Sequence, residues 1–136
     1  MAKKILIIED EPDILTYLIA VLEDHGFDAV SIADQAAVGD AVKSIQPDLI
    51  MLDVMMPRRS GVSIYRELKS SPELKTIPVA IISGFSPEGN DMAAGFNRML
   101  PDEAIEVPNG FVDKPVDRQA LIALACRLTS GGEDRI

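Results

Sequence analysis

Four short apolar segments, each followed by polar residues, constrain the fold of this chain more than any other feature. None of the four alternates apolar with polar residues, which is typical of strands that helices cover on both faces. The segments are Ile5–Ile8 before Glu9-Asp10-Glu11, Leu49–Leu52 before Asp53, Val79–Ile82 before Ser83, and Phe111-Val112 before Asp113-Lys114. In an open parallel sheet the carboxyl ends of the strands lie side by side and form the ligand crevice. We therefore expect these polar groups to meet at one edge of the sheet.

The stretches between these segments carry apolar residues at helical spacing. We expect helices from Pro12 to a stop at Gly26, from Asp34 to Ile45, from Gly61 to Ser70 and from Asp117 to Leu128, and an outer strand over Phe27–Ala33. The alternation of strands and helices predicts an α/β fold, a doubly wound parallel sheet with helices on both faces. One region does not fit this pattern, because Lys114 lies 31 positions after Ser83 and a βα unit normally needs fewer.

Length and composition exclude several classes of protein. The 136 residues suffice for one domain, and a net charge of −9 argues against direct nucleic-acid binding, which needs a basic face. The single cysteine, Cys126, excludes an internal disulfide and fits a reducing compartment, and we expect it to pack on the apolar face of the last helix. The sequence carries no secretory signal peptide and no membrane-spanning stretch. These features predict a cytoplasmic domain that binds neither membranes nor nucleic acid.

The polar residues at the predicted strand ends suit a divalent cation and a phosphoryl group. Asp10 and Asp53 are hard oxygen ligands of the kind that magnesium takes in small number, and Glu9 could act through a water molecule. Asp53 can also attack phosphorus as a nucleophile and form an acyl phosphate. Lys114 and the hydroxyl of Ser83 would then bind the phosphoryl oxygens that the cation does not hold.

The chain resembles a response-regulator receiver domain of two-component signalling. Four motifs carry the resemblance, in this order: Ile8-Glu9-Asp10-Glu11-Pro12, Leu52-Asp53-Val54-Met55-Met56-Pro57 with Gly61 eight residues after Asp53, Ile82-Ser83-Gly84, and Phe111-Val112-Asp113-Lys114-Pro115. The resemblance implies a receiver domain over residues 1–129 with a polar tail over residues 130–136. It also implies a five-stranded parallel sheet with the flavodoxin-like strand order 2-1-3-4-5.

The resemblance assigns a role to each site residue. Asp53 would be the phosphoacceptor, with a sensor histidine kinase or a histidine phosphotransfer protein as the donor. Mg²⁺ would be bound by Asp10, Asp53, the backbone carbonyl of Met55 and, through water, Glu9. Ser83 and Lys114 would bind the phosphoryl group. Phe111 would be the switch aromatic, the residue that changes rotamer on phosphorylation. The domain would be no enzyme beyond its own phosphorylation and dephosphorylation, and it would switch a protein-interaction surface whose downstream target or output domain is left open.

Three departures from the family pattern affect which properties of the family this chain can be expected to share. The first acid is Glu9 rather than the commoner aspartate, with a longer side chain and the same charge. The interval between Ser83 and Lys114 is about ten residues longer than usual, in the region of the family's usual output and dimerisation surface. Met55 and Phe85 are apolar where many relatives carry polar groups. Because neither can orient a water molecule for hydrolysis, we expect a long-lived phosphorylated form.

Three other functions compete with this interpretation. A magnesium-dependent phosphohydrolase that forms an aspartyl phosphate would need a second acid two residues after the nucleophile, where this chain has Met55. A nucleotide-binding flavodoxin-like module would need a glycine-rich first loop, where this chain has Glu9-Asp10-Glu11-Pro12. A receiver that only docks to partners would not take phosphate, and the complete set of acids, serine and lysine argues against it. For Glu11 itself we expect only a helix N-cap or a solvated position.

Overall fold

The computed structural model describes residues 2–32, 38–53, 61–83, 109–113 and 116–129. In these ranges, five parallel strands form one sheet in the order β2-β1-β3-β4-β5. The elements, in chain order, are β1 (Lys4–Ile8), α1 (Pro12–Asp24), β2 (Asp28–Ser31), α2 (Val38–Ile45), β3 (Leu49–Asp53), α3 (Gly61–Ser70), β4 (Val79–Ser83), β5 (Gly110–Asp113) and α5 (Arg118–Thr129). The predicted α/β fold, a doubly wound parallel sheet with the flavodoxin-like order 2-1-3-4-5, is confirmed.

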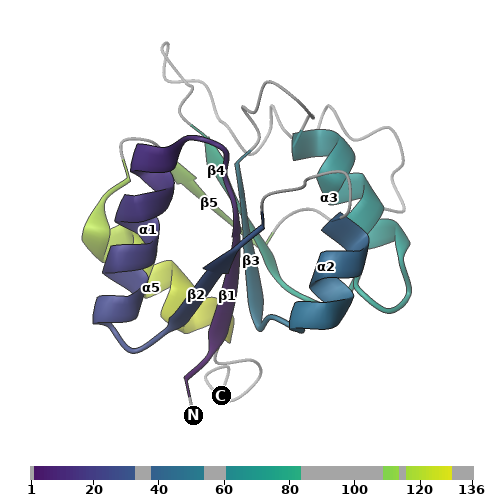
Figure 1. Ribbon diagram of the computed structural model, residues 1–136, viewed down its shortest axis with the longest axis horizontal. Helices are drawn as coiled ribbons and strands as arrows, with labels where there is room; N and C mark the ends of the chain where they lie inside the picture. The colour runs from purple at the N-terminus through teal and green to yellow at the C-terminus, as the bar shows by residue number, and fades with distance from the viewer. Residues whose placement is uncertain (1, 33–37, 54–60, 84–108, 114–115, 130–136) are drawn as a thin grey trace.

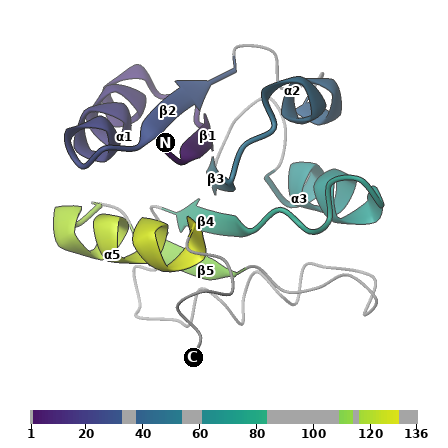
Figure 2. The same ribbon diagram turned by 90° about the horizontal axis from the view of Figure 1, so that it is seen from below.

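Helices cover both faces of the sheet. Figure 1 shows α1 and α5 on one side and α2 and α3 on the other, and Figure 2 shows the sheet between these two pairs from below. Alternate residues of a strand point to opposite faces, so Ile5 and Ile7 of β1 pack with α1 and α5, whereas Leu6 and Ile8 pack with α2 and α3. All four are 0% exposed, and burial of each contributes roughly 1.5–3 kcal/mol to folding. Within the described ranges, no helix is long and apolar enough to span a bilayer.

A polar clamp aligns the amino ends of the two central strands. The backbone N–H of Lys4 donates to Oδ2 of Asp48 at 2.8 Å, and the N–H of Asp48 donates to the carbonyl oxygen of Lys4 at 2.7 Å. This clamp fits the register in which Ile5 lies opposite Leu49. Because a slip by one residue would turn every side chain of β3 to the wrong face, the clamp also helps to determine which residues meet at the carboxyl ends.

The helices begin and end close to the predicted positions. α1 starts at Pro12, and Glu11 before it is exposed with extended backbone, as expected for a residue at a helix N-cap. Gly26 has φ = +88°, the left-handed conformation that commonly follows the end of a helix. α5 starts one residue later than predicted because Asp117 is its N-cap, with Oδ2 accepting the N–H of Ala120 at 2.9 Å.

Two sequence predictions about these elements are wrong. The outer strand covers only Asp28–Ser31 rather than Phe27–Ala33. Cys126 does not pack on the apolar face of α5 but is exposed, because the buried stripe of that helix runs through Leu121, Leu124, Ala125 and Leu128. The predicted start of α2 at Asp34 falls in residues 33–37, which lie outside the described ranges.

Gly39 lies inside α2 although glycine is a poor helix former. Its backbone N–H donates to Oε2 of Glu67 in α3 at 3.2 Å, and a Cβ added at Gly39 would lie 2.9 Å from the same oxygen. This hydrogen bond joins α2 to α3 on one face of the sheet.

Contacts at its start hold the short strand β5 against β4. The backbone N–H of Asn109 donates to the carbonyl oxygen of Val79 at 2.9 Å, and Oδ1 of Asn109 accepts the N–H of Val79 at 3.0 Å. The next residue, Gly110, lies against α5, since a Cβ there would be 2.6 Å from Cδ1 of Leu124. These contacts support the register of the two strands and so the position of the carboxyl end of β5.

Candidate functional site

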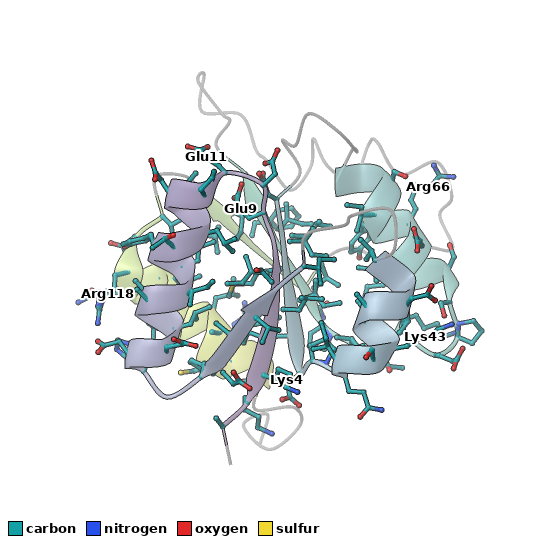
Figure 3. All side chains as sticks on the ribbon, viewed as in Figure 1. Lys4, Glu9, Glu11, Lys43, Arg66 and Arg118 are labelled. Carbon is teal, nitrogen blue, oxygen red and sulfur yellow. The ribbon has the colours of Figure 1, made fainter. Side chains whose placement is uncertain are left out.

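The strand register brings the predicted site residues to one edge of the sheet. Glu9 follows the last residue of β1, and the pairing of β1 with β3 puts it beside Asp53. On the other side of β3, Asp53 pairs with the residue that precedes Ser83 in β4. Ser83 in turn lies opposite Asp113, which Lys114 follows. Figure 3 shows Glu9 at this edge, where β1 passes into α1.

Three carboxylates converge at this edge. Glu9, Asp10 and Asp53 each offer one oxygen, and these oxygens all lie within 4.8 Å of one another. Glu9 and Asp53 are buried, with exposures of 3% and 1%, whereas Asp10 is exposed. Oε2 of Glu9 accepts the backbone N–H of Glu11 at 3.2 Å, which orients the Glu9 carboxylate at the start of α1. The cluster therefore has two acids inside the fold and one at its surface.

This set of oxygen atoms fits a hard divalent cation. Carboxylates at this separation repel one another, and burial of two of them reduces the screening that water would provide. Mg²⁺ binds such carboxylates in small number and keeps its other positions for water and phosphate oxygens. The cluster offers none of the nitrogen and sulfur ligands that are typical of structural zinc sites. These acids could therefore hold a magnesium ion.

The structure describes only part of the predicted phosphoryl-binding set. Ser83 is the last residue of β4, and only its backbone is described. Phe111 lies in β5, is partly buried and packs against the apolar cluster on the α2 and α3 side of the sheet. Lys114, Met55 and Phe85 lie outside the described residues, so their assigned roles stay predictions.

The contacts between α1 and the start of α5 were not predicted from the sequence. The hydroxyl of Tyr17 donates to the carbonyl oxygen of Val116 at 3.2 Å, and Arg118 forms an ion pair with Asp24 at the end of α1. Figure 3 shows Arg118 next to α1. The one available signal was a hydroxyl-bearing aromatic side chain among the apolar residues of the first helix. Its partner could not be named, because Tyr17 and Val116 are 99 residues apart.

Comparison with known proteins agrees with the class that this fold and site define. A family model described as the response regulator receiver domain matches residues 5–125, and the chain belongs to that family. Receiver domains are signalling domains of two-component systems rather than classical enzymes, and they accept phosphate from histidine kinases.

Individual relatives support this membership over nearly the whole chain. Protein Rrf1 from Nitratidesulfovibrio vulgaris is 29% identical over 127 residues, which cover 93% of this chain and 83% of that protein. The phosphate regulon transcriptional regulatory protein PhoB from Escherichia coli is 31% identical over 90% of this chain, which spans only 50% of PhoB. The solved signal receiver domain of a signal transduction histidine kinase from Syntrophus aciditrophicus matches with a TM-score of 0.79 at 28% identity, over 98% of this chain and 94% of that chain.

Proposed function

We propose that this chain accepts a phosphoryl group on Asp53 and that this modification switches a protein-interaction surface. The observation that carries the proposal is the position of Asp53 at the end of the central strand β3. It is 1% exposed, and one of its oxygens lies within 4.8 Å of oxygens of Glu9 and Asp10. The donor would be a phosphohistidine of a sensor histidine kinase or of a histidine phosphotransfer protein, as family membership supports.

The transfer would begin with attack of an Asp53 carboxylate oxygen on phosphorus. The new P–O bond forms as the P–N bond to the donor imidazole breaks, and the electrons of that bond pass to the ring nitrogen. The product is an acyl phosphate. The attacking carboxylate and the phosphoryl oxygens are both negative, and Glu9 and Asp10 add charge of the same sign. Positive charge must therefore be present in the site before the transfer can occur.

Mg²⁺, when bound, would supply that positive charge. Its proposed protein ligands are Asp10, Asp53 and the backbone carbonyl of Met55, while Glu9 would orient a water ligand. Because Asp10 is exposed and the other two acids are buried, the cluster is open to solvent on the side of Asp10. We infer that the phosphodonor approaches from that side.

The proposal also gives roles to three residues that would respond to the phosphoryl group, namely Lys114, Ser83 and Phe111. The pairing of Ser83 with Asp113, the residue before Lys114, supports convergence of the hydroxyl and the ammonium on the same phosphoryl group. Phe111 lies two residues before Asp113 on β5 and would change rotamer when Ser83 moves toward the phosphate. Because phosphate can bias two conformations only by contacting them differently, these three residues would carry the signal to the surface.

We infer that residues 1–129 form the receiver and residues 130–136 a polar tail. The net charge of −9 is unsuited to direct contact with nucleic acid, so an effect on DNA would require a separate output domain or a protein partner. We place the reaction in the cytoplasm, in keeping with the single cysteine of the chain, which cannot form an internal disulfide.

Intact-mass measurement after incubation with acetyl phosphate and Mg²⁺ tests the proposed function. The wild-type protein should gain one phosphoryl group, and removal of divalent cations with EDTA should prevent the gain. Asp53→Asn should gain none, because it lacks the nucleophilic carboxylate. Asp40→Asn, which removes an exposed acid of α2 outside the cluster, should gain the group as the wild type does. A full mass gain in Asp53→Asn would contradict the assignment.

We also propose that Met55 and Phe85 give the phosphorylated form a long lifetime. Hydrolysis needs a water molecule placed in line behind phosphorus, and neither side chain can hydrogen-bond that water. The Met55→Asn, Phe85→Glu double variant should therefore lose its phosphoryl group about tenfold faster or more, since each 1.4 kcal/mol or so of barrier changes a rate tenfold. The measurement is the decay of phosphorylated protein by intact mass. An unchanged decay rate would exclude apolar shielding as the cause of the lifetime.

A further inference from the structure

Two exposed acids lie next to the acid cluster, and their side chains form no polar contact within the described part of the chain. Glu11 follows Asp10 directly, and Asp13 lies in the first turn of α1. Glu11 is the N-cap residue of α1, but its side chain forms no capping hydrogen bond. The negative charges of Glu11 and Asp13 are therefore not neutralised by a described side chain.

These two acids lie on the side of the cluster that is open to solvent. Oε2 of Glu9 accepts the backbone N–H of Glu11 at 3.2 Å, so α1 begins in contact with the cluster. Glu9 and Asp53 are buried. Asp10, Glu11 and Asp13 are all exposed. A phosphodonor that reaches Asp53 from the exposed side therefore passes the charges of Glu11 and Asp13.

The described lysines lie at the other end of the sheet. Figure 3 shows Glu9 and Glu11 at one end of the molecule and Lys4 and Lys43 at the opposite end. Lys4 begins β1, and Lys43 lies in the last turn of α2. Neither lysine is near enough to offset the exposed acids at the start of α1. The amino end of α1 contributes a partial positive charge of about one half, which is smaller than the two whole charges of these acids.

We propose that Glu11 and Asp13 are specificity-determining residues that select phosphodonors by charge. They disfavour a small donor of high negative charge and favour a donor with cationic groups beside its phosphoryl group, such as a phosphohistidine protein with a basic surface. This inference rests on the proposed phosphorylation of Asp53. A variant that lacks only these two acids shares every other charge of the site with the wild type, so a comparison of the two isolates their effect.

Three phosphodonors of different charge test the inference with one double variant, Glu11→Gln, Asp13→Asn. Acetyl phosphate is doubly negative at neutral pH, and acetate leaves with the electrons of its P–O bond. Phosphoramidate has a single net negative charge, and ammonia leaves with the electrons of its P–N bond. The third donor is a synthetic peptide of net positive charge with phosphohistidine between lysines, from which the histidine peptide leaves. The rate of phosphoryl gain is measured by intact mass at saturating Mg²⁺ and low ionic strength.

The double variant should gain rate with the anionic donors and lose rate with the cationic one. At roughly 10 Å in water, two unit charges change an equilibrium about twofold, so the rate should rise about three- to fivefold with acetyl phosphate and about twofold with phosphoramidate. The rate from the lysine peptide should fall about two- to threefold. The same peptide with glutamine in place of lysine should show no such fall. At about 1 M salt, where the Debye length is about 3 Å, these differences should disappear.

A matched double variant separates the position of the two charges from their number. Glu23→Gln, Asp28→Asn also removes one glutamate and one aspartate, and both positions are exposed. Glu23 lies ten residues after Asp13, which is about 15 Å along α1. Asp28 begins β2, beyond the end of that helix. This variant should keep the wild-type rate with every donor.

Several results would overturn the inference. These are wild-type rates in Glu11→Gln, Asp13→Asn, equal effects of the two double variants, a change of the same sign with all three donors, or a rate from the lysine peptide that is no lower than in the wild type. In all of these cases the wild-type protein still gains its phosphoryl group from acetyl phosphate, and the proposed function stands. Failure of the wild-type protein to gain the group from any donor would instead contradict the proposed function and this inference together.

Discussion

At the scale of single residues, the buried charged and polar side chains fall into two kinds. Lys69 and Thr129 are buried and donate hydrogen bonds to backbone carbonyl oxygens, so their polarity is satisfied by the fold itself. Glu9 and Asp53 are buried with carboxylate oxygens within 4.8 Å of each other and of Asp10. Like charges at this separation repel, so the acids of the cluster destabilise one another's charged forms, and a bound cation would offset this repulsion.

This repulsion leads to a prediction about Asp53→Asn in the absence of divalent cations. The variant removes one of two buried negative charges and keeps the size of the side chain. Its free energy of unfolding in EDTA, measured with urea, should exceed that of the wild type by roughly 1–3 kcal/mol. Asp40→Asn, at an exposed position of α2 outside the cluster, should unfold at the wild-type urea concentration. If Asp53→Asn unfolds at lower urea than the wild type, the carboxylate is held by favourable contacts and the account of the cluster is wrong.

Addition of Mg²⁺ should narrow the difference in stability between Asp53→Asn and the wild type. A ligand at ten times its dissociation constant stabilises the folded state by about 1.4 kcal/mol, provided that the unfolded chain does not bind it. The wild-type protein and Asp40→Asn should both gain this amount, whereas Asp53→Asn and Asp10→Asn should gain less because each lacks one charged ligand. Equal stabilisation of all four proteins by Mg²⁺ would show that the ion binds elsewhere.

At the scale of elements, the position of β5 depends on close packing against α5. Gly110 begins the strand, and a Cβ at this position would lie 2.6 Å from Cδ1 and 3.3 Å from Cδ2 of Leu124. Leu124 is itself buried at 8% exposure, so its side chain has little room to move away. The absence of a side chain at Gly110 therefore determines how near α5 lies to the strand that leads to Lys114.

Gly110→Ala should accordingly lower the free energy of unfolding by roughly 1–3 kcal/mol, the usual range for an overpacked core. In a Leu124→Ala background most of this loss should disappear, because the clashing atoms are gone. Gly26→Ala provides the matched control, since a Cβ there would meet nothing within 4 Å and only the φ of +88° opposes a side chain. Gly26→Ala should lower the free energy of unfolding by about 1 kcal/mol, with either leucine or alanine at position 124. Urea unfolding measures both effects in the wild type, Gly110→Ala and Gly26→Ala, and in the same three proteins with Leu124→Ala added. Additive losses of stability for Gly110→Ala and Leu124→Ala would contradict the packing account.

At the scale of the whole molecule, local patterns were enough to predict the layers and the acid cluster. The apolar segments that become β1 and β3 are continuous because both faces of those strands are covered, so they indicated a parallel sheet directly. α3 was predicted over Gly61–Ser70 and is found there. In such a sheet, residues that follow neighbouring strands must share an edge, which is why Glu9, Asp10 and Asp53 could be grouped before their distances were known.

The features that escaped prediction depend on contacts between distant parts of the chain. The bond from Tyr17 to Val116 and the clamp between Asn109 and Val79 exist only once the sheet and helices have assembled. Cys126 was predicted on the wrong face of α5 because alanine and cysteine are small and apolar enough to occupy either face. Residue type alone therefore could not show which of them is buried. The hydrogen bond from the N–H of Gly39 to Glu67 likewise forms only when α2 and α3 lie side by side.

The central claim is that the Asp53 side chain itself becomes the acyl phosphate, and borohydride reduction tests it most directly. Borohydride reduces an acyl phosphate of aspartate to homoserine and leaves free carboxylates unchanged. After treatment with acetyl phosphate and Mg²⁺, reduction and proteolysis, peptide mass spectrometry should find homoserine at position 53 alone. The same protocol without Mg²⁺ should find aspartate there. Homoserine at position 10 or at another acid, with position 53 unchanged, would contradict the account.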